Sequence, residues 1–82
     1  MHKPERGDLY QHFKGESYVV HMVATDCTNY SNNDEYVVYS TITDTQHIFI
    51  RKLSEFTSKV DANKYPAYEH HDRFKFLGNL KK

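Results

Sequence analysis

The stretch Tyr10-Gln11-His12-Phe13-Lys14-Gly15, followed closely by Tyr18-Val19-Val20, decides the fold of this chain. It predicts a short aromatic strand, a tight turn at the Lys-Gly pair and a second strand that returns beside the first. The glycine supplies the backbone freedom that such a turn requires. The pattern is typical of a small β-barrel and contains no catalytic constellation.

Length and composition limit what the chain can build. With 82 residues it is expected to form one domain, and a domain of this size has little interior to spare for a large cavity. Seven tyrosines and five phenylalanines, with no tryptophan, favour strands, where aromatic side chains fit a half-buried pleated surface. We therefore expect a mostly β protein whose functional site lies on the surface or between subunits.

Alternation of apolar and polar residues predicts the order of the elements. Four strands are expected, at residues 9–13, 18–24, 35–42 and 46–51. The polar segment 26–34 is expected to be the longest loop, and residues 53–56 to form one helical or 3₁₀ turn. A β-meander is the simplest connection.

The C-terminal third carries a weaker pattern. Residues 57–60 and 65–68 are expected to pair as a last hairpin, with Pro66 at an edge because it lacks an N–H. The tail 69–82 is expected to extend from the domain, adding an edge strand before it frays. Together these elements predict a small barrel of five or six antiparallel strands with its core at about residues 7–68.

Charge and cysteine content narrow the classes of partner. Eleven basic and eleven acidic residues leave no net charge, so neither nucleic acid nor a membrane is expected as a partner. Cys27 is the only cysteine, which excludes a disulfide within the chain and favours a reducing cytoplasm. The sequence contains neither a signal-like apolar segment nor a membrane-spanning apolar run.

The chain resembles a family of short bacterial and phage proteins of unknown function that fold as SH3-like β-barrels. The resemblance rests on four pieces in the family's order: Tyr10-x-His12-Phe13-Lys14-Gly15, Tyr18-Val19-Val20, Glu35-Tyr36-Val37-Val38-Tyr39 and Arg51-x-Leu53-x-x-Phe56. It departs where Arg51-Lys52-Leu53 replaces Arg-Pro-Leu and where Ile42-Thr43-Asp44 replaces a Tyr-Gly turn. The resemblance implies the barrel and supplies no catalytic residues.

No combination of residues indicates catalysis. The chain has no paired-carboxylate pattern, no glycine-rich phosphate loop and no metal-ligand spacing. Cys27 follows Asp26, whose negative charge disfavours the thiolate. His70-His71-Asp72 is the densest group of metal-capable side chains, but neighbours on an extended tail point to opposite faces, which favours a solvated surface. We expect a protein that is not an enzyme and uses no metal or cofactor.

Arg51 is the strongest single candidate for a functional residue. A guanidinium at a strand end beside Phe49 and Lys52 can hold a phosphate or carboxylate while an aromatic ring stacks on the ligand. The alternative is an ion pair within the chain, with Glu35, Asp44 or Glu55. The predicted ligand-binding set is completed by aromatic, histidine and arginine side chains: Tyr10, His12, Tyr36, Tyr39, His47 and Arg73.

Side-chain direction refines this set. Tyr10 and His12 share one face of the first strand, and we expect that face to point outward as a contact surface. For His12, His21 and His47 the alternative is a packed, hydrogen-bonded side chain. Seven tyrosines are too many for one small core, so some must be exposed, and Tyr30, Tyr36 and Tyr39 are the candidates.

Two functions fit these observations. The first is a non-enzymatic module that binds a small anionic ligand derived from a nucleotide, at a site between subunits of a homodimer or higher homo-oligomer. In a phage it would act as a sponge for a host immune signal. The second is a protein-interaction module that offers a host protein a tyrosine-rich surface or an open strand edge. Single-stranded nucleic acid is the weaker option because the balanced charge predicts no basic groove.

Overall fold

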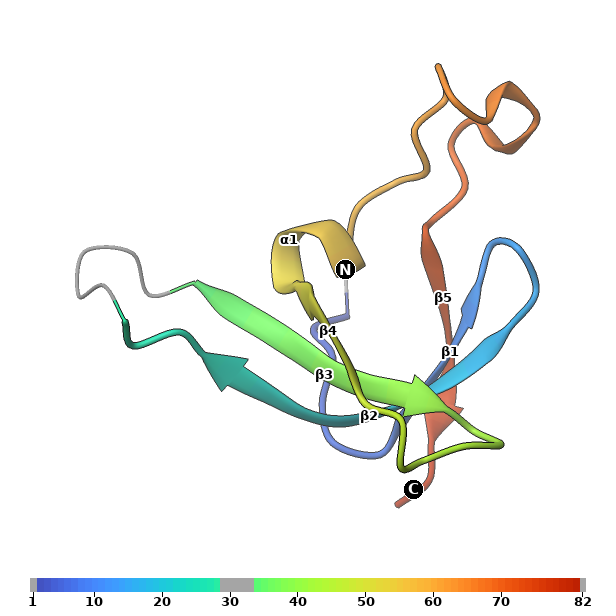
Figure 1. The fold of residues 1–82 in the computed structure, drawn as a ribbon. Coiled ribbons are helices and arrows are strands. Elements are labelled where there is room, and N and C mark those ends of the chain that lie inside the picture. Colours follow the sequence, from blue (N-terminus) through green and yellow to red (C-terminus); the bar gives the residue numbers. More distant parts are fainter. Residues whose placement is uncertain (1, 29–33, 82) are drawn as a thin grey trace.

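A computed structural model describes residues 2–28 and 34–81 and contains one antiparallel five-stranded sheet (Figure 1). Its strands are β1 (Asp8–His12), β2 (Ser17–Thr25), β3 (Glu35–Thr41), β4 (Phe49–Lys52) and β5 (Phe74–Asn79). The helices are α1 (Leu53–Phe56) and the 3₁₀ helix η1 (Pro66–Tyr68). The prediction of a mostly β fold with five antiparallel strands and a short helical turn is confirmed.

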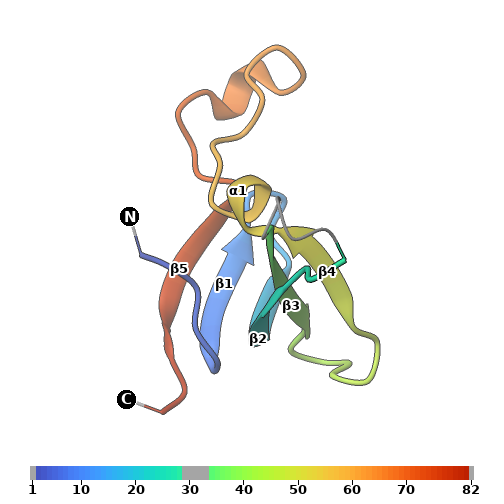
Figure 2. The same ribbon diagram turned by 90° about the vertical axis from the view of Figure 1, so that its left-hand side faces the viewer.

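The sheet curves but does not close. Its strand order is β4-β3-β2-β1-β5, so β4 and β5 form the two edges. Figure 2 shows these edges on opposite sides, with α1 above the strands between them. Within the described residues, neither helix has the length and apolar character that crossing a membrane demands.

The hairpin predicted from the opening stretch is present. Tyr10 of β1 lies opposite Tyr18 of β2, and the chain reverses at Gly15, whose φ of 109° disfavours any residue with a Cβ. The Gly15 amide donates to the His12 carbonyl at 2.7 Å, and the His12 amide donates to the Glu16 carbonyl at 2.8 Å. Local chemistry alone therefore determines this part of the fold.

The segment before β5 differs from the prediction. Residues 46–48 precede β4 rather than belonging to it, and residues 57–60 do not pair with residues 65–68. Instead, Lys59 forms an isolated bridge with Asp72, and Pro66 starts η1, where its missing N–H costs nothing. Figures 1 and 2 show residues 57–73 as an excursion beyond the sheet.

The tail adds the edge strand that the sequence predicts, but it also enters the core. β5 pairs with β1, and Phe74 is only 5% exposed. The core therefore extends beyond residue 68, because β5 lies next to β1 and turns its inner face toward the other strands. The buried cluster consists of Tyr10, Val20, Val37, Tyr39, Phe56 and Phe74.

Aromatic contacts dominate this core. The rings of Phe56 and Phe74 stack at 4.1 Å with an interplanar angle of 6°. Tyr10 and Tyr39 meet the Phe56 ring edge-on, at 5.0 Å and 5.3 Å. The prediction that Tyr10 and Tyr39 are exposed is wrong, because their rings pack against Phe56 of α1 and are only 4% and 5% exposed.

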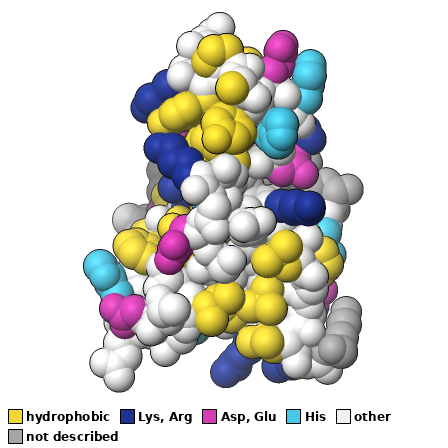
Figure 3. Space-filling view, turned by 90° about the vertical axis from the view of Figure 1, so that its right-hand side faces the viewer, with side chains coloured by type: hydrophobic (Ala, Val, Ile, Leu, Met, Phe, Trp, Pro, Cys, Tyr) yellow, Lys and Arg dark blue, Asp and Glu magenta, His cyan; other side chains and the backbone are white. Residues whose placement is uncertain are grey.

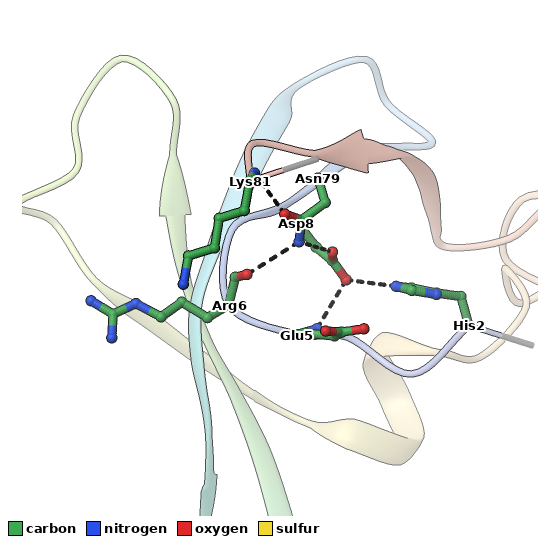
Figure 4. A network of polar contacts seen from close by, with 6 residues as sticks. All are labelled: His2, Glu5, Arg6, Asp8, Asn79 and Lys81. Carbon is green, nitrogen blue, oxygen red and sulfur yellow. Dashed lines mark hydrogen bonds and ion pairs between the residues drawn. The ribbon is translucent and has the colours of Figure 1, made fainter.

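A buried carboxylate joins the two ends of the chain (Figure 4). Asp8 is 1% exposed and accepts hydrogen bonds from His2 Nε2 at 2.8 Å, the Glu5 amide at 2.9 Å and Asn79 Nδ2 at 2.7 Å. Burial raises the pKa of Asp8, but the hydrogen bonds from Asn79, Glu5 and His2 outweigh it and hold the pKa below its ordinary value. This network fastens the N-terminal segment and the end of β5 to β1.

Replacing this carboxylate is expected to destabilise the protein. Asp8→Ala should lower the free energy of unfolding by about 2 kcal/mol or more at neutral pH, because three donors lose a charged acceptor. Since the folded-state pKa is depressed, the Asp8 contribution is present above pH 3.8 and is lost as the pH falls through the folded-state pKa. Urea unfolding from neutral to acidic pH measures both effects.

The matched control is Glu16→Ala, which removes a carboxylate at an exposed position. Its effect should stay within about 0.5 kcal/mol. An Asp8→Ala protein as stable as this control, or one that keeps the wild-type loss of stability in acid, would contradict the role assigned to Asp8.

Candidate functional site

A groove of about 340 Å³ lies where the β1–β2 turn, β4 and the 57–73 excursion meet. It is lined by His12, Phe13, Lys14, Arg51, Asp61, Lys64, Tyr65 and Arg73. Four of these residues are Lys or Arg and only Asp61 is acidic, in a chain without net charge. On the face that carries the turn and the excursion, Lys and Arg side chains lie beside hydrophobic ones (Figure 3). We call this site the basic groove.

Arg51 is held in the groove by two contacts. It lies opposite Val37, which is fully buried, so both residues belong to the inner face of the sheet. Its Nε donates to Tyr39 Oη at 3.2 Å, and its guanidinium carbon lies 5.5 Å from the centroid of the Phe74 ring. A cation above an aromatic face is stabilised by the ring quadrupole. The guanidinium position is therefore fixed by the core.

The ion pair considered as the alternative for Arg51 does not form within residues 2–28 and 34–81. No carboxylate there lies within 4.0 Å of the guanidinium, and Glu35 pairs with Lys3 at 3.3 Å instead. Glu55 is exposed on α1 and makes no ion pair with Arg51 among the described residues. Arg51 therefore keeps its charge available to a ligand.

Arg73 is anchored in a similar way. Its Nε donates to Ser58 Oγ at 3.2 Å, its amide donates to the Ser58 carbonyl at 3.0 Å, and its carbonyl accepts from the Phe13 amide at 3.0 Å. Both arginines thus use Nε for a structural hydrogen bond. In the part of the chain that the structure describes, the Nη groups of neither make one. These are the groups that grip phosphate or carboxylate through two parallel bonds.

Two lysines flank Tyr65 on the other side of the groove. Lys14 Nζ lies 4.9 Å and Lys64 Nζ 5.7 Å from the centroid of the Tyr65 ring. Phe13 packs edge-on against the same ring at 5.1 Å. The Lys14 ammonium beside it, together with the charges of Lys64 and Arg73, lowers the pKa of Tyr65 below its ordinary value. These neighbouring cations, Lys14 first, therefore favour the phenolate form of Tyr65.

The His12 ring also lines the groove, among the same cations. Its Nδ1 accepts a hydrogen bond from the Lys14 amide at 3.2 Å, so the proton of the neutral ring is on Nε2. Burial, then the charges of Arg51, Lys14 and Arg73, lower the pKa of His12 below 6.5. At neutral pH His12 is therefore an uncharged hydrogen-bond donor.

The structure does not bring the other predicted site residues to the groove. Lys52 lies on the opposite face, 3.6 Å from Asp34 Oδ2, with Tyr36 beside it in register. Phe49 packs against the core and carries His47 on its ring at 4.7 Å. Of the nine predicted residues, His12, Arg51 and Arg73 line the groove, whereas Tyr30, a further candidate, lies outside the described residues.

Sequence reasoning missed the lysines and Tyr65. The sequence pattern places Lys14 only in a turn, and Lys64 and Tyr65 only in a hairpin that does not form. One sequence feature could have indicated these residues: each of the two segments has a lysine directly next to an aromatic residue, Phe13-Lys14 and Lys64-Tyr65. The sequence offers no indication that these two pairs meet.

Other surface features are weaker candidates for a functional site than the basic groove. A larger hollow of about 460 Å³ includes His71, Asp72 and Lys75, but its charges are mixed and Asp72 already pairs with Lys59 at 2.7 Å. His70 and His71 are exposed, and the described residues contain no cluster of three metal-capable side chains. Cys27 is exposed and far along the chain from the basic residues of the groove.

Comparison with known proteins gives a family without an assigned activity. Residues 8–76 match the family described as "Protein of unknown function (DUF1653)". No curated protein and no solved structure gives a significant match. The matched region runs from β1 into β5 and includes every residue that lines the basic groove.

The potential in the groove can be measured at His12. Arg51→Gln is expected to raise the pKa of His12, because it removes the charge that opposes protonation of this ring most strongly. The measurement is an NMR titration of the histidine ring signals. Lys52→Gln, which removes a cation on the opposite face of the same strand, should leave the pKa of His12 unchanged. A His12 pKa insensitive to Arg51→Gln would show that the two side chains do not share the groove.

Proposed function

The chain belongs to the DUF1653 family of proteins of unknown function, and we propose that it is a non-enzymatic module that binds a small anionic ligand derived from a nucleotide. One observation carries the proposal. Arg51 and Arg73 are each fixed through Nε, and their Nη groups line one groove together with Lys14 and Lys64. Because the two guanidinium groups are already held in place, less conformational entropy is lost when an anion binds.

The charge distribution supports an anionic ligand. The whole chain is neutral, yet the groove gathers four cations around one carboxylate, Asp61. An anion there gains charge-assisted hydrogen bonds, which are about twice as strong as neutral ones. The lowered pKa values of His12 and Tyr65 both have the direction that a positive potential produces.

The aromatic residues and the size of the groove support a nucleotide-like ligand. Tyr65 and Phe13 stand beside the lysines and offer ring surface on which a base can stack. Stacking on one such ring contributes about 1–3 kcal/mol. A volume of about 340 Å³ is at the small end of ligand sites, which suits a mononucleotide or part of a larger nucleotide.

The same groove offers little for catalysis. Its only carboxylate is Asp61, and neither a serine nor a cysteine lines it. A bound nucleotide would therefore be held and released unchanged, as in a sponge that sequesters a signal.

A protein-interaction role is the second candidate. Met22, Val38 and Ile50 lie side by side across β2, β3 and β4 on the outer face of the sheet. Met22 is 54% and Ile50 66% exposed, and β4 has a free edge. An extended peptide could pair with that edge while its side chains cover the apolar row.

Calorimetric titration of AMP and adenosine tests the first proposal. AMP should bind at least about tenfold more tightly than adenosine, because only AMP brings a phosphate to the arginines. Arg51→Gln and Arg73→Gln should each weaken AMP binding by about tenfold or more. Raising the salt concentration should weaken it as well.

The control variant is Lys52→Gln, which should bind AMP as the wild type does. Equal affinity for AMP and adenosine, or no binding of either, would contradict an anion-binding function. A protein partner whose binding is lost in Ile50→Lys and kept in Arg51→Gln would support the second candidate instead.

A further inference from the structure

His12 lies among the cations of the basic groove. It lines that groove together with Arg51, Arg73 and Lys14. The ring centroids of His12 and Phe74 are 5.0 Å apart, and the Arg51 guanidinium carbon lies 5.5 Å from the same Phe74 centroid. The imidazole and the guanidinium therefore share one aromatic neighbour and belong to one cluster.

The imidazole is held in place by the first hairpin. Its Nδ1 accepts a hydrogen bond from the Lys14 amide at 3.2 Å. Its ring lies 4.5 Å from the ring of Phe13 and 6.5 Å from that of Tyr18, measured between centroids. A proton added to this ring therefore places a positive charge beside cations that are already fixed.

Three effects oppose the protonation of His12. Burial disfavours the charged ring, and the charges of Arg51, Lys14 and Arg73 repel it, which together lower its pKa. The protonated ring also loses the hydrogen bond from the Lys14 amide, because imidazolium has no acceptor nitrogen. The cations that repel the proton are among those to which the proposed function assigns the anion.

An anion bound to these cations would cancel part of the repulsion. A negative charge near an imidazole favours the protonated form, and the protonated ring in turn adds a cation to the site. The anion and the proton therefore increase the affinity for each other by the same factor. Burial and the Lys14 amide do not change this factor, since they act on His12 whether or not an anion is bound.

An aspartate, a lysine and two tyrosines are the other ionisable residues to consider in the groove and on β2. Aspartate and lysine side chains, here Asp61 and Lys64, ordinarily keep their charge between about pH 5 and pH 8. Burial raises the pKa of Tyr18, so its phenol stays neutral in this range. The pKa of Tyr65 is lowered from 10.0, so a comparison of binding at different pH should stop near neutrality.

His12 also lines the hollow of about 460 Å³ beside the groove. The other ionisable residues of that hollow are His71, Asp72 and Lys75. Asp72 is paired with Lys59 at 2.7 Å. Histidine is the side chain that ordinarily changes charge near neutral pH, so His71 has to be followed together with His12.

We propose that His12 is the proton-linked member of the anion site: an anion that binds Arg51 and Arg73 is taken up together with a proton on His12, so the groove binds anions more tightly as the pH falls. The inference rests on the proposed anion-binding function and adds a regulator to the same groove. Affinity is highest below the pKa that His12 has in the complex, and it is lost to a constant lower level as the pH rises through that value.

An NMR pH titration with and without sodium sulfate, at constant ionic strength, tests the coupling. Sulfate keeps both negative charges throughout the range, so a change in proton binding belongs to the protein. Saturating sulfate should raise the pKa of His12 by about 0.5 or more, which corresponds to a gain in sulfate affinity of about threefold or more at low pH. The pKa of His47, which packs on Phe49 outside the groove, should not change.

His12→Asn removes the titrating ring and keeps an acceptor for the Lys14 amide. Between about pH 7.5 and pH 5 the wild type should gain about threefold or more in sulfate affinity, whereas this variant should change by less than about twofold. His47→Asn is the matched control and should keep the pH dependence of the wild type.

The outcomes separate this inference from the proposed function. Sulfate binding that shifts the Arg51 and Arg73 Nε–H signals but leaves the pKa of His12 unchanged would overturn the coupling alone. A pH dependence that persists in His12→Asn, or a sulfate-induced pKa change at His71 instead of His12, would do the same. Arginine signals that do not respond to sulfate at either pH would overturn both the anion site and its coupling to the proton.

Discussion

The ring of Phe74, held between Phe56 and Arg51, is the interaction on which the rest of the structure depends. It is delivered by the last strand, stacks at 4.1 Å on the short helix and supports a guanidinium from the strand at the opposite edge. An aromatic pair and a cation–π contact each contribute only about 1 kcal/mol beyond burial. Their importance here is geometric, because they join three elements that share no sheet hydrogen bonds with one another.

A second constraint is the size of the chain. With 82 residues the hydrophobic cluster is small, and polar contacts complete the packing at the open end of the sheet. The Asp8 network fastens the N-terminal segment to β5, and the Leu80 amide donates to the Gly7 carbonyl at 2.9 Å. These contacts hold the two chain ends together, and the sheet is open because its edge strands, β4 and β5, do not pair. Curvature brings the β1–β2 turn, β4 and the 57–73 excursion together, and the basic groove follows from it.

The sequence predicts those parts of the structure that are determined by residues close together along the chain. The Lys14-Gly15 turn and the alternation in β2 and β3 predict the first strands, and the spacing of Leu53 and Phe56 predicts a helical turn. Alternation also predicts that Tyr10 and His12 share one face of β1. It does not predict whether that face is the inner or the outer face of the sheet. That depends on β5 pairing with β1, a contact between distant parts of the chain. Arg51 could be selected from its strand-end position, whereas Lys14, Lys64 and Tyr65 meet only because residues 57–73 fold back in a way that no local pattern encodes.

The most direct test of the account is an NMR map of inorganic phosphate binding that includes the arginine Nε–H and lysine side-chain signals. The account predicts that phosphate shifts the signals of Arg51 and Arg73 most, then those of Lys14 and Lys64, and leaves Lys52 and Lys3 unaffected. Saturable shifts centred on Lys52 or Lys3, or an unperturbed pair of arginines, would contradict an anion site built on the Phe74 ring.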